Sequence, residues 1–348
     1  MQWGDMYIVG TGASLPPSMP IDAAVSAGLY APDEAERTQL LAVATANATQ
    51  SAPDFAVAAA RAAILRAECD PEDIGVLLYA VLLHAGVDLW NAASYIQRAL
   101  GVRDALIAEI RSACNGALVG VELACSFLRS RPNHPLALVT AADCWPPTVL
   151  DRWRATAGFV FGDGGAAVVL SRKPGFARVL SVVTTTDPTL EGLNRGRESF
   201  GAVAQRASHI DLRRRAREFG EVMPEEELWR RCDDGLRSAV EAATREAEVS
   251  LSEIDHIVFP FVGEQLMQFE YLRPLGLRIE ETTWESGRRI GNIGAGGALV
   301  GLNQLADSGR LVRGDHVLLV GIGGGFIWTA MVLQVLRDFH PSPGPPSI

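Results

Sequence analysis

The chain has 348 residues, of which 48% are hydrophobic and 21% are charged, and its formal net charge is −10. This length and composition allow a large buried core and two or three domains. An acidic chain that has no basic, aromatic-rich stretch is poorly suited to nucleic acid or an anionic membrane as its main partner.

The first half of the chain predicts alternating strands and helices. Residues 7–10 predict a strand that enters a glycine-rich turn at 11–13, and residues 55–66 predict an alanine-rich helix. The other elements expected in this half are strands at 76–81, 105–110, 136–140 and 166–170, and helices around 92–97 and from Cys114 onwards.

The second half repeats this alternation, with helices expected at 234–248 and 298–306 and strands at 257–260, 317–320 and 328–335. Strands that are continuous apolar runs predict mostly parallel sheets that are buried on both faces. The helices that open at Gly116 and Gly297 are apolar on nearly all sides, so we expect them between two sheets. The predicted fold class is therefore α/β, with five layers in the order α/β/α/β/α.

An internal repeat supports this architecture. The pentapeptide Gly-Ala-Leu-Val-Gly occurs at 116–120 and again at 297–301, which is 181 residues later. The segment 67–79 resembles 247–259, and the apolar run from His134 resembles the run from His316, at separations of 180 and 182 residues. A period of this size indicates a duplicated half-fold and not a solenoid.

The repeat predicts an N-terminal half at 1–173 and a C-terminal half at 174–338 that carries an insertion around 184–229, with a flexible tail at 339–348. Within the insertion lie four clustered arginines, Arg213, Arg214, Arg215 and Arg217. Such a charge run is usually a solvated helix face, and the alternative is a docking patch for an acidic partner.

The five cysteines show no CxxC pair and no histidine at metal-ligand spacing, so we expect neither a zinc site nor a disulfide framework. The N-terminus has no signal-peptide pattern and no apolar run approaches the ~18 residues that span a bilayer, so we expect a cytoplasmic protein. Cys114 lies two residues before the first pentapeptide, where the second copy has Ala295. A thiol at a helix N-terminus is expected to have a lowered pKa and to act as a nucleophile, although many cysteines are only buried core residues.

Four motifs carry a family resemblance that covers nearly the whole chain. They are Ser-Ala-Cys-Asn-Gly at 112–116, Phe-Gly-Asp-Gly-Gly-Ala-Ala at 161–167, Asn-Ile-Gly-Ala at 292–295 and Gly-Ile-Gly-Gly-Gly-Phe-Ile-Trp at 321–328. In this order they resemble the β-ketoacyl-acyl-carrier-protein synthase III-like enzymes of the thiolase superfamily. Segments 94–97 and 151–154 are similar to an acyltransferase subgroup of bacterial secondary metabolism.

The resemblance implies that Cys114 accepts an acyl group as a thioester. It also implies that the backbone N–H groups of Cys114 and Gly324 form an oxyanion hole, and that Asn292 is the active-site asparagine. Each such donor contributes on the order of 3 kcal/mol. The implied substrate is the thioester of an acyl carrier protein phosphopantetheine or of CoA, with no tightly bound cofactor and no metal, and the implied assembly is a homodimer.

One departure from the family changes the expected reaction. Condensing members carry a histidine directly after the proline that corresponds to Pro260, and this chain has Phe261 there. Loss of that donor makes decarboxylative condensation doubtful, whereas acyl transfer to a thiol needs less help because a thiol is partly ionised at working pH. An alcohol acceptor would need a base, for which the candidates are His84 and Glu264, although residues of these types in such a context are more often structural or pocket residues.

The leading hypothesis is therefore an acyltransferase that moves an acyl group through Cys114 to a carrier thiol or to a hydroxyl. The alternatives are a condensing synthase that uses His84, and a partner subunit without chemistry of its own. The candidate pocket residues are aromatic and suggest an aryl or short branched acyl group, unless they only pack the core; they are Trp90, Phe159, Phe161, Phe261 and Trp328.

Overall fold

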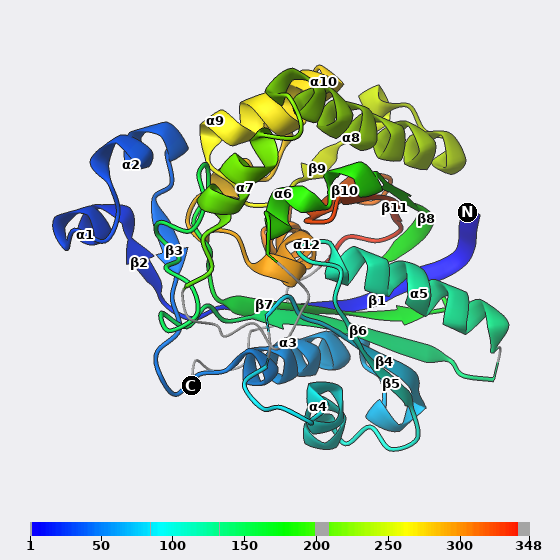
Figure 1. The fold of residues 1–348 in the computed structure, drawn as a ribbon. Coiled ribbons are helices and arrows are strands. Elements are labelled where there is room, and N and C mark those ends of the chain that lie inside the picture. The colour runs from blue at the N-terminus through cyan, green and yellow to red at the C-terminus, as the bar shows by residue number, and fades with distance from the viewer. Residues whose placement is uncertain (1, 84, 132, 199–208, 340–348) are drawn as a thin grey trace.

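A computed structural model describes residues 2–83, 85–131, 133–198 and 209–339. In this part of the chain nine strands form one hydrogen-bonded sheet that folds back on itself, and two short strands form a second sheet (Figure 1). The order of the large sheet is β5 (Leu106–Ile110), β4 (Ile74–Ala80), β6 (Leu136–Asp143), β7 (Gly164–Ser171), β1 (Gln2–Ser14), β8 (Ala177–Thr186), β11 (Ile327–Val335), β10 (His316–Gly323) and β9 (His256–Val258). The small sheet pairs β2 (Ser18–Pro20) with β3 (Ala42–Ala44).

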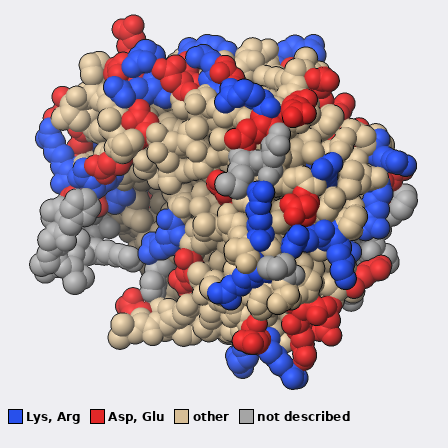
Figure 2. Space-filling view, turned by 90° about the vertical axis from the view of Figure 1, so that its right-hand side faces the viewer, with Lys and Arg blue, Asp and Glu red and all other residues tan. Residues whose placement is uncertain are grey.

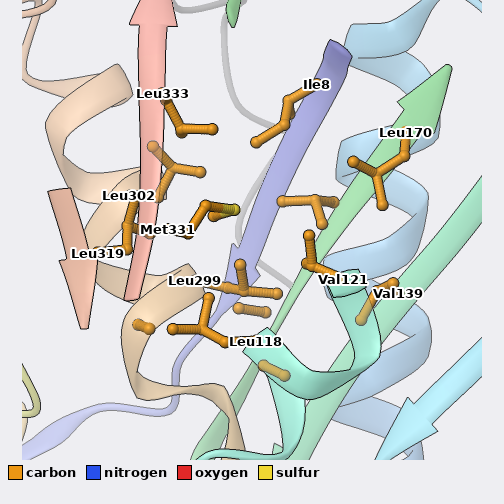
Figure 3. Close-up of a cluster of buried hydrophobic side chains, with 14 of the residues drawn as sticks. Ile8, Leu118, Val121, Val139, Leu170, Leu299, Leu302, Leu319, Met331 and Leu333 are labelled. Carbon is orange, nitrogen blue, oxygen red and sulfur yellow. The ribbon is translucent and has the colours of Figure 1, made fainter. Parts of the chain in front are cut away.

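Two apolar helices lie between the two layers of the folded sheet. They are α5 (Gly116–Ser130) and α12 (Gly297–Asp307), the two copies of the repeat. Figure 3 shows Leu118 and Val121 of α5 and Leu299 of α12 among strand side chains such as Val139 and Met331, all of them buried. Burial of this surface on both sides is the main stabilising contribution of the fold.

Helices cover the two outer faces of the body. The helices α3 (Ala52–Ala67) and α4 (Ala92–Leu100) pack on the first-half strands, and α8 (Glu225–Ala247) packs on β8 and β11. This arrangement confirms the predicted five-layered, thiolase-like α/β/α/β/α fold. The remaining helices are short: α1 (Ile21–Ser26), α2 (Pro32–Thr38), α6 (Gly192–Arg195), α7 (Leu212–Gly220), α9 (Glu264–Leu266), the π-helix η4 (Met267–Leu272), α10 (Arg273–Leu275) and α11 (Trp284–Gly287).

The prediction of mostly parallel sheets is wrong. Parallel pairing joins β4 to β5, β4 to β6 and β9 to β10, whereas the other neighbouring strands of the large sheet run antiparallel. The tight connection between β10 and β11 forms an antiparallel hairpin, and Gly325 adopts a φ of 105° in its turn. Strand β8 was not among the predicted elements, although it joins the two layers through β1 and β11.

Two more predictions require correction. Residues 11–13 do not form a turn but continue β1. Phe339, assigned to the flexible tail, packs its ring against Phe176 at a centroid distance of 4.8 Å, and the rest of that tail lies outside the described residues. The division into halves at residue 173 stays a prediction.

The glycines in β1 allow the close approach of α3. A Cβ atom at Gly10 would lie 2.1 Å from the Ala63 carbonyl oxygen, and one at Gly12 would lie 2.3 Å from that of Ala59. These contacts are with backbone atoms of α3, which cannot move without shifting the helix. Only glycine therefore fits at these two positions.

We predict that Gly10→Val destabilises the protein by at least about 1–3 kcal/mol, because the new side chain forces α3 away from the sheet. Chemical denaturation monitored by circular dichroism measures the change. Gly220→Ala is the control, since a Cβ there meets no atom within 4 Å. Equal stabilities for the two variants would contradict this account of the β1–α3 packing.

Candidate active site

Cys114 lies on a tight turn between β5 and α5. Ala113, the residue before it, has a φ of 47°, in the left-handed region that is unfavourable for a residue with a side chain. The turn is closed by the N–H of Asn115, which donates to the Ser112 carbonyl at 3.1 Å, and by that of Gly116, which donates to the Ala113 carbonyl at 3.2 Å. The turn leaves Cys114 half-buried in the lining of a cavity at the N-terminus of α5.

The β10–β11 hairpin of the second half packs directly against this turn. A Cβ atom at Gly323 would lie 2.5 Å from the Ser112 carbonyl oxygen, so the glycine allows the two backbones to approach. Asn115 ties them together, because its Nδ2 donates to Thr329 Oγ1 at 2.7 Å. Gly324 lines the same cavity as Cys114, and their joint role as an oxyanion hole stays a prediction.

Asn292 reaches the cavity from a loop that is fixed by its backbone. Its N–H donates to the Val160 carbonyl and its carbonyl accepts from the Gly162 N–H, both at 2.8 Å. The side-chain Oδ1 accepts the Gly294 N–H at 2.9 Å. The amide Nδ2 is therefore the group of Asn292 that can donate to a ligand in the cavity.

A buried carboxylate that the sequence analysis did not single out organises these loops. Asp143, at the end of β6, accepts the N–H groups of Leu82 and Leu83 at 2.8 and 3.0 Å through Oδ1, and that of Ala295 at 2.8 Å through Oδ2. Burial raises the pKa of Asp143 to about 7, although these three bonds and Arg111 oppose the shift. A lone aspartate that ends a fully buried strand was the available sequence signal.

A buried ion pair supports the aromatic side of the cavity. Arg152 donates to Asp163 Oδ2 at 2.7 Å and to the carbonyls of Trp145 and Phe161 at 3.1 and 3.2 Å. Asp163 in turn accepts the Trp145 N–H at 2.8 Å. Because both side chains are buried, removing either one would leave an uncompensated charge. The pair therefore fixes the backbone that carries Trp145 and Phe161.

The cavity has a volume of about 390 Å³, in the range of small-ligand sites. It is lined by residues of both halves, and most of its surface is apolar. The rings of Trp145 and Phe161 are 4.1 Å apart, and those of Phe159 and Phe161 are 5.0 Å apart. Its aromatic residues are Trp145, Phe159, Phe161, Trp229, Tyr271 and Phe326, and Glu270 adds a carboxyl group.

Three of the five predicted pocket residues do not line this cavity. Trp90 is 41% exposed and faces Tyr95, because it precedes α4 at the outer surface. Phe261 is buried in the core, where a Cβ atom at Gly287 would meet its ring at 2.2 Å. Trp328 points to the opposite face of β11 from Ile327 and packs over Gly235 of α8. Phe159 and Phe161 do line the cavity.

Of the two predicted bases, only Glu264 belongs to the described residues. His84 lies outside the described residues. Glu264 lines a separate hollow with Arg37, Phe269 and Arg273, since it precedes the π-helix and faces outward. A base role for Glu264 next to the thiol is therefore not supported by its position.

The arginine cluster is mostly used within the chain. Arg213 pairs with Glu34 at 2.9 Å, Arg214 with Glu218 at 2.6 Å and Arg215 with Glu198 at 2.8 Å. Arg215 also lines the cavity. Arg217 has an exposed side chain. Three of the four cations therefore stabilise the insertion, and docking through the cluster stays a prediction.

The prediction of a lowered pKa for Cys114 is wrong for this structure. Burial raises the pKa of the thiol to about 12 and the negative charge of Asp143 adds to the increase, while the backbone N–H of Cys114 opposes it. Desolvation of the thiolate is the largest of these effects, and it acts against the stabilisation that a helix N-terminus gives to a thiolate. Cys114 is protonated at neutral pH, and its proton must leave as the thiol reacts.

We predict that the alkylation rate of Cys114 by iodoacetamide still increases between about pH 8 and pH 10, because a thiol with this raised pKa has not finished titrating there. Peptide mass spectrometry at each pH gives the rate for this residue, with Cys114→Ala as the background. A rate that reaches its plateau near neutral pH would contradict the raised pKa and would instead support the prediction of a thiolate with a lowered pKa.

Two general properties of the described residues bear on function. Among the described helices, none combines the length and apolar character that crossing a bilayer requires. Within the same residues there is no group of three or more His, Cys, Asp or Glu side chains that could hold a metal ion.

The site combines a cysteine at the N-terminus of a central helix with an asparagine and a glycine-rich turn from the second half. Together with the layered, repeated fold, this combination defines a thiolase-type site. The family model for 3-oxoacyl-[acyl-carrier-protein] synthase III matches residues 108–188, and the model for its C-terminal part matches 244–335. ChlB3, a solved structure described as an acyltransferase, is 35% identical with a TM-score of 0.91, covering 96% of this chain and 99% of its own.

Two further relatives extend the comparison. The β-ketoacyl-[acyl-carrier-protein] synthase III of Synechocystis sp. is 27% identical over 293 residues, which are 83% of this chain and 84% of the relative. The 3-oxoacyl-(acyl carrier protein) synthase III, FabH, of Pseudomonas aeruginosa has the same fold, with a TM-score of 0.77 at 21% identity, covering 97% of this chain and 99% of its own. The chain belongs to the β-ketoacyl-acyl-carrier-protein synthase III-like family of the thiolase superfamily.

Proposed function

We propose that the protein is an acyltransferase that takes an acyl group from a carrier protein or CoA thioester onto Cys114 and passes it to a second carrier thiol or to a natural-product hydroxyl. The observation that carries this proposal is the meeting of Cys114, Gly324 and Asn292 at one cavity while the family's histidine position is filled by Phe261. The similarity to ChlB3, an acyltransferase by its description, favours the same reaction class.

In the first step, Sγ of Cys114 attacks the carbonyl carbon of the donor thioester. The carbonyl oxygen becomes an oxyanion, which the N–H groups of Cys114 and Gly324 would stabilise. When the tetrahedral intermediate collapses, the bond to the donor sulfur breaks and the donor leaves as a thiol with the proton that Cys114 lost. The step is balanced without an external proton, which suits a nucleophile that starts as a protonated thiol.

In the second step, the sulfur or oxygen of the acceptor attacks the Cys114 thioester and Cys114 recovers its proton. Condensation would instead require an enolate, formed by loss of carbon dioxide and stabilised by hydrogen-bond donors. Phe261 offers no donor, and its ring is buried in the core away from the cavity. Simple transfer is therefore the reaction that these residues favour.

Two assembly features belong to the same proposal. A carrier protein would dock near the mouth of the cavity. Reversing the charge of Arg217, the exposed arginine of the cluster, tests this: acylation by carrier-bound thioesters should slow, and acylation by small thioesters should not. On the face shown in Figure 2, basic and acidic side chains are interspersed over the described residues.

A homodimer would continue the large sheet at its edge strand β5, where Leu106 is 48% exposed.

We predict that incubation of the wild-type protein with a panel of acyl carrier protein and CoA thioesters gives a mass increase equal to one acyl group, because Cys114 forms a thioester. Intact-protein mass spectrometry measures it, and hydroxylamine should remove the adduct. Cys114→Ala should show no increase.

Cys125→Ala is the matched control, because Cys125 is buried on the same helix and does not line the cavity. It should accept the acyl group as the wild type does. Full transfer activity in Cys114→Ala would contradict the proposal, and the absence of an adduct with any donor would favour a partner subunit without chemistry.

A further inference from the structure

Glu270 places a carboxyl group in the lining of the otherwise apolar cavity. It belongs to the π-helix η4, whose wider turn is a feature that recurs at functional sites. Its neighbours in the lining include Trp229 and Cys232 of α8, and Tyr271 follows it in the chain. This part of the lining comes entirely from the second half.

The structure gives the Glu270 carboxyl neither a hydrogen-bond donor nor a cationic partner among the described residues. The neighbouring charge is that of Asp233, whose own partner is Arg273 at 3.2 Å. Burial, and then Asp233, raise the pKa of Glu270 to about 7. An unpartnered acid in an apolar environment lowers stability, and such groups concentrate at functional sites. A bound ligand is therefore the available partner for this group.

Glu270 and Cys114 line the same cavity, and so does Tyr271, which follows Glu270 in the chain. Burial raises the pKa of Tyr271, and the nearby Glu270 carboxylate adds to the shift. The pKa of Cys114 itself is raised by burial and by Asp143. An acyl group attached to Cys114 would therefore enter the same cavity that Glu270 lines.

We propose that Glu270 determines substrate specificity by accepting a hydrogen bond from a hydroxyl group carried on the transferred acyl group, which rests on the acyl transfer proposed above. A hydroxyl suits this place better than a protonated amine, because an ammonium group would have to give up far more hydration to enter the aromatic cavity. A site built around a hydrogen bond also rejects analogues that lack the hydroxyl, since the buried carboxyl is then left unpaired.

The test uses pairs of small N-acetylcysteamine thioesters that differ only in one hydroxyl: 3-hydroxybenzoyl against benzoyl, and 5-hydroxypentanoyl against pentanoyl. Each pair competes for the enzyme, and intact mass spectrometry gives the ratio of the two adducts. In the wild type we expect at least about a tenfold preference for the hydroxylated member of one pair. Glu270→Leu should remove or reverse this preference, and Glu270→Gln, which keeps an acceptor oxygen, should retain part of it.

Glu264→Leu is the matched control, because this glutamate lies close in sequence but lines a separate hollow, and its ratio should equal that of the wild type. Thermal melting checks that each variant is folded; if Glu270→Leu does not fold, Glu270→Gln and the wild-type ratios decide. Adducts that form equally from both members of both pairs in the wild type would overturn the inference while leaving the acyl transfer intact.

Two other outcomes are also decisive. An unchanged adduct ratio in Glu270→Leu, together with slower transfer from preloaded enzyme to a hydroxyl acceptor, would show that Glu270 serves the acceptor and would overturn the inference. If none of these thioesters, nor any carrier or CoA thioester, gives an adduct on the wild type, the proposed function fails, and the specificity inference fails with it.

Discussion

The candidate site depends on the hydrogen bonds that one buried carboxylate makes across the two halves of the chain. Asp143 binds the backbone after β4 through Leu82 and Leu83, and it binds the Asn292 loop of the second half through Ala295. Backbone N–H groups buried without a partner would each cost about 1–3 kcal/mol. The pKa of about 7 shows that burial outweighs even three such donors in its effect on the carboxyl group, so this junction is maintained at a cost in desolvation.

The same burial shapes the chemistry proposed for Cys114. Withdrawal from water raises the pKa of the thiol, so its reactivity toward solvent-borne electrophiles is low at neutral pH. A more basic thiolate is also the stronger nucleophile once it forms. A thioester that enters the cavity brings a leaving sulfur that can accept the proton of Cys114. The glycine-rich turn of the second half places its backbone beside the same cavity. These groups suit the exchange of an acyl group between thiols, whereas Phe261, which is buried in the core, offers no hydrogen-bond donor to an enolate.

The layered fold could be predicted because an internal repeat and the periodicity of apolar residues are visible in the sequence itself. It predicted that Cys114, Asn292 and Gly324 belong together because each lies in a short motif. Strand direction was predicted wrongly, since apolar composition does not distinguish parallel from antiparallel pairing and only the connections decide it. Asp143 was not identified as a site residue because its partners Leu82, Leu83 and Ala295 are distant in the sequence. Arg152 was not identified because the sequence does not show that it is buried against Asp163.

The aromatic and acidic residues of the cavity show the same limit. Trp328 was misplaced because it packs under α8 against Gly235, beyond the cavity-lining Phe326, and composition does not show how far along a strand a cavity extends. Glu270 was missed because a π-helix changes which residues share a face, and its sequence gives no strong sign of that turn.

The central claim is that the acyl group on Cys114 is transferred without formation of a carbon–carbon bond. The most direct measurement supplies preloaded acyl-enzyme with a carrier thiol and with a malonyl carrier labelled at its free carboxylate, and follows both the products and the released carbon dioxide. The account predicts a new acyl thioester on the free carrier and no labelled carbon dioxide above background. A β-ketoacyl product with stoichiometric release of labelled carbon dioxide would contradict it.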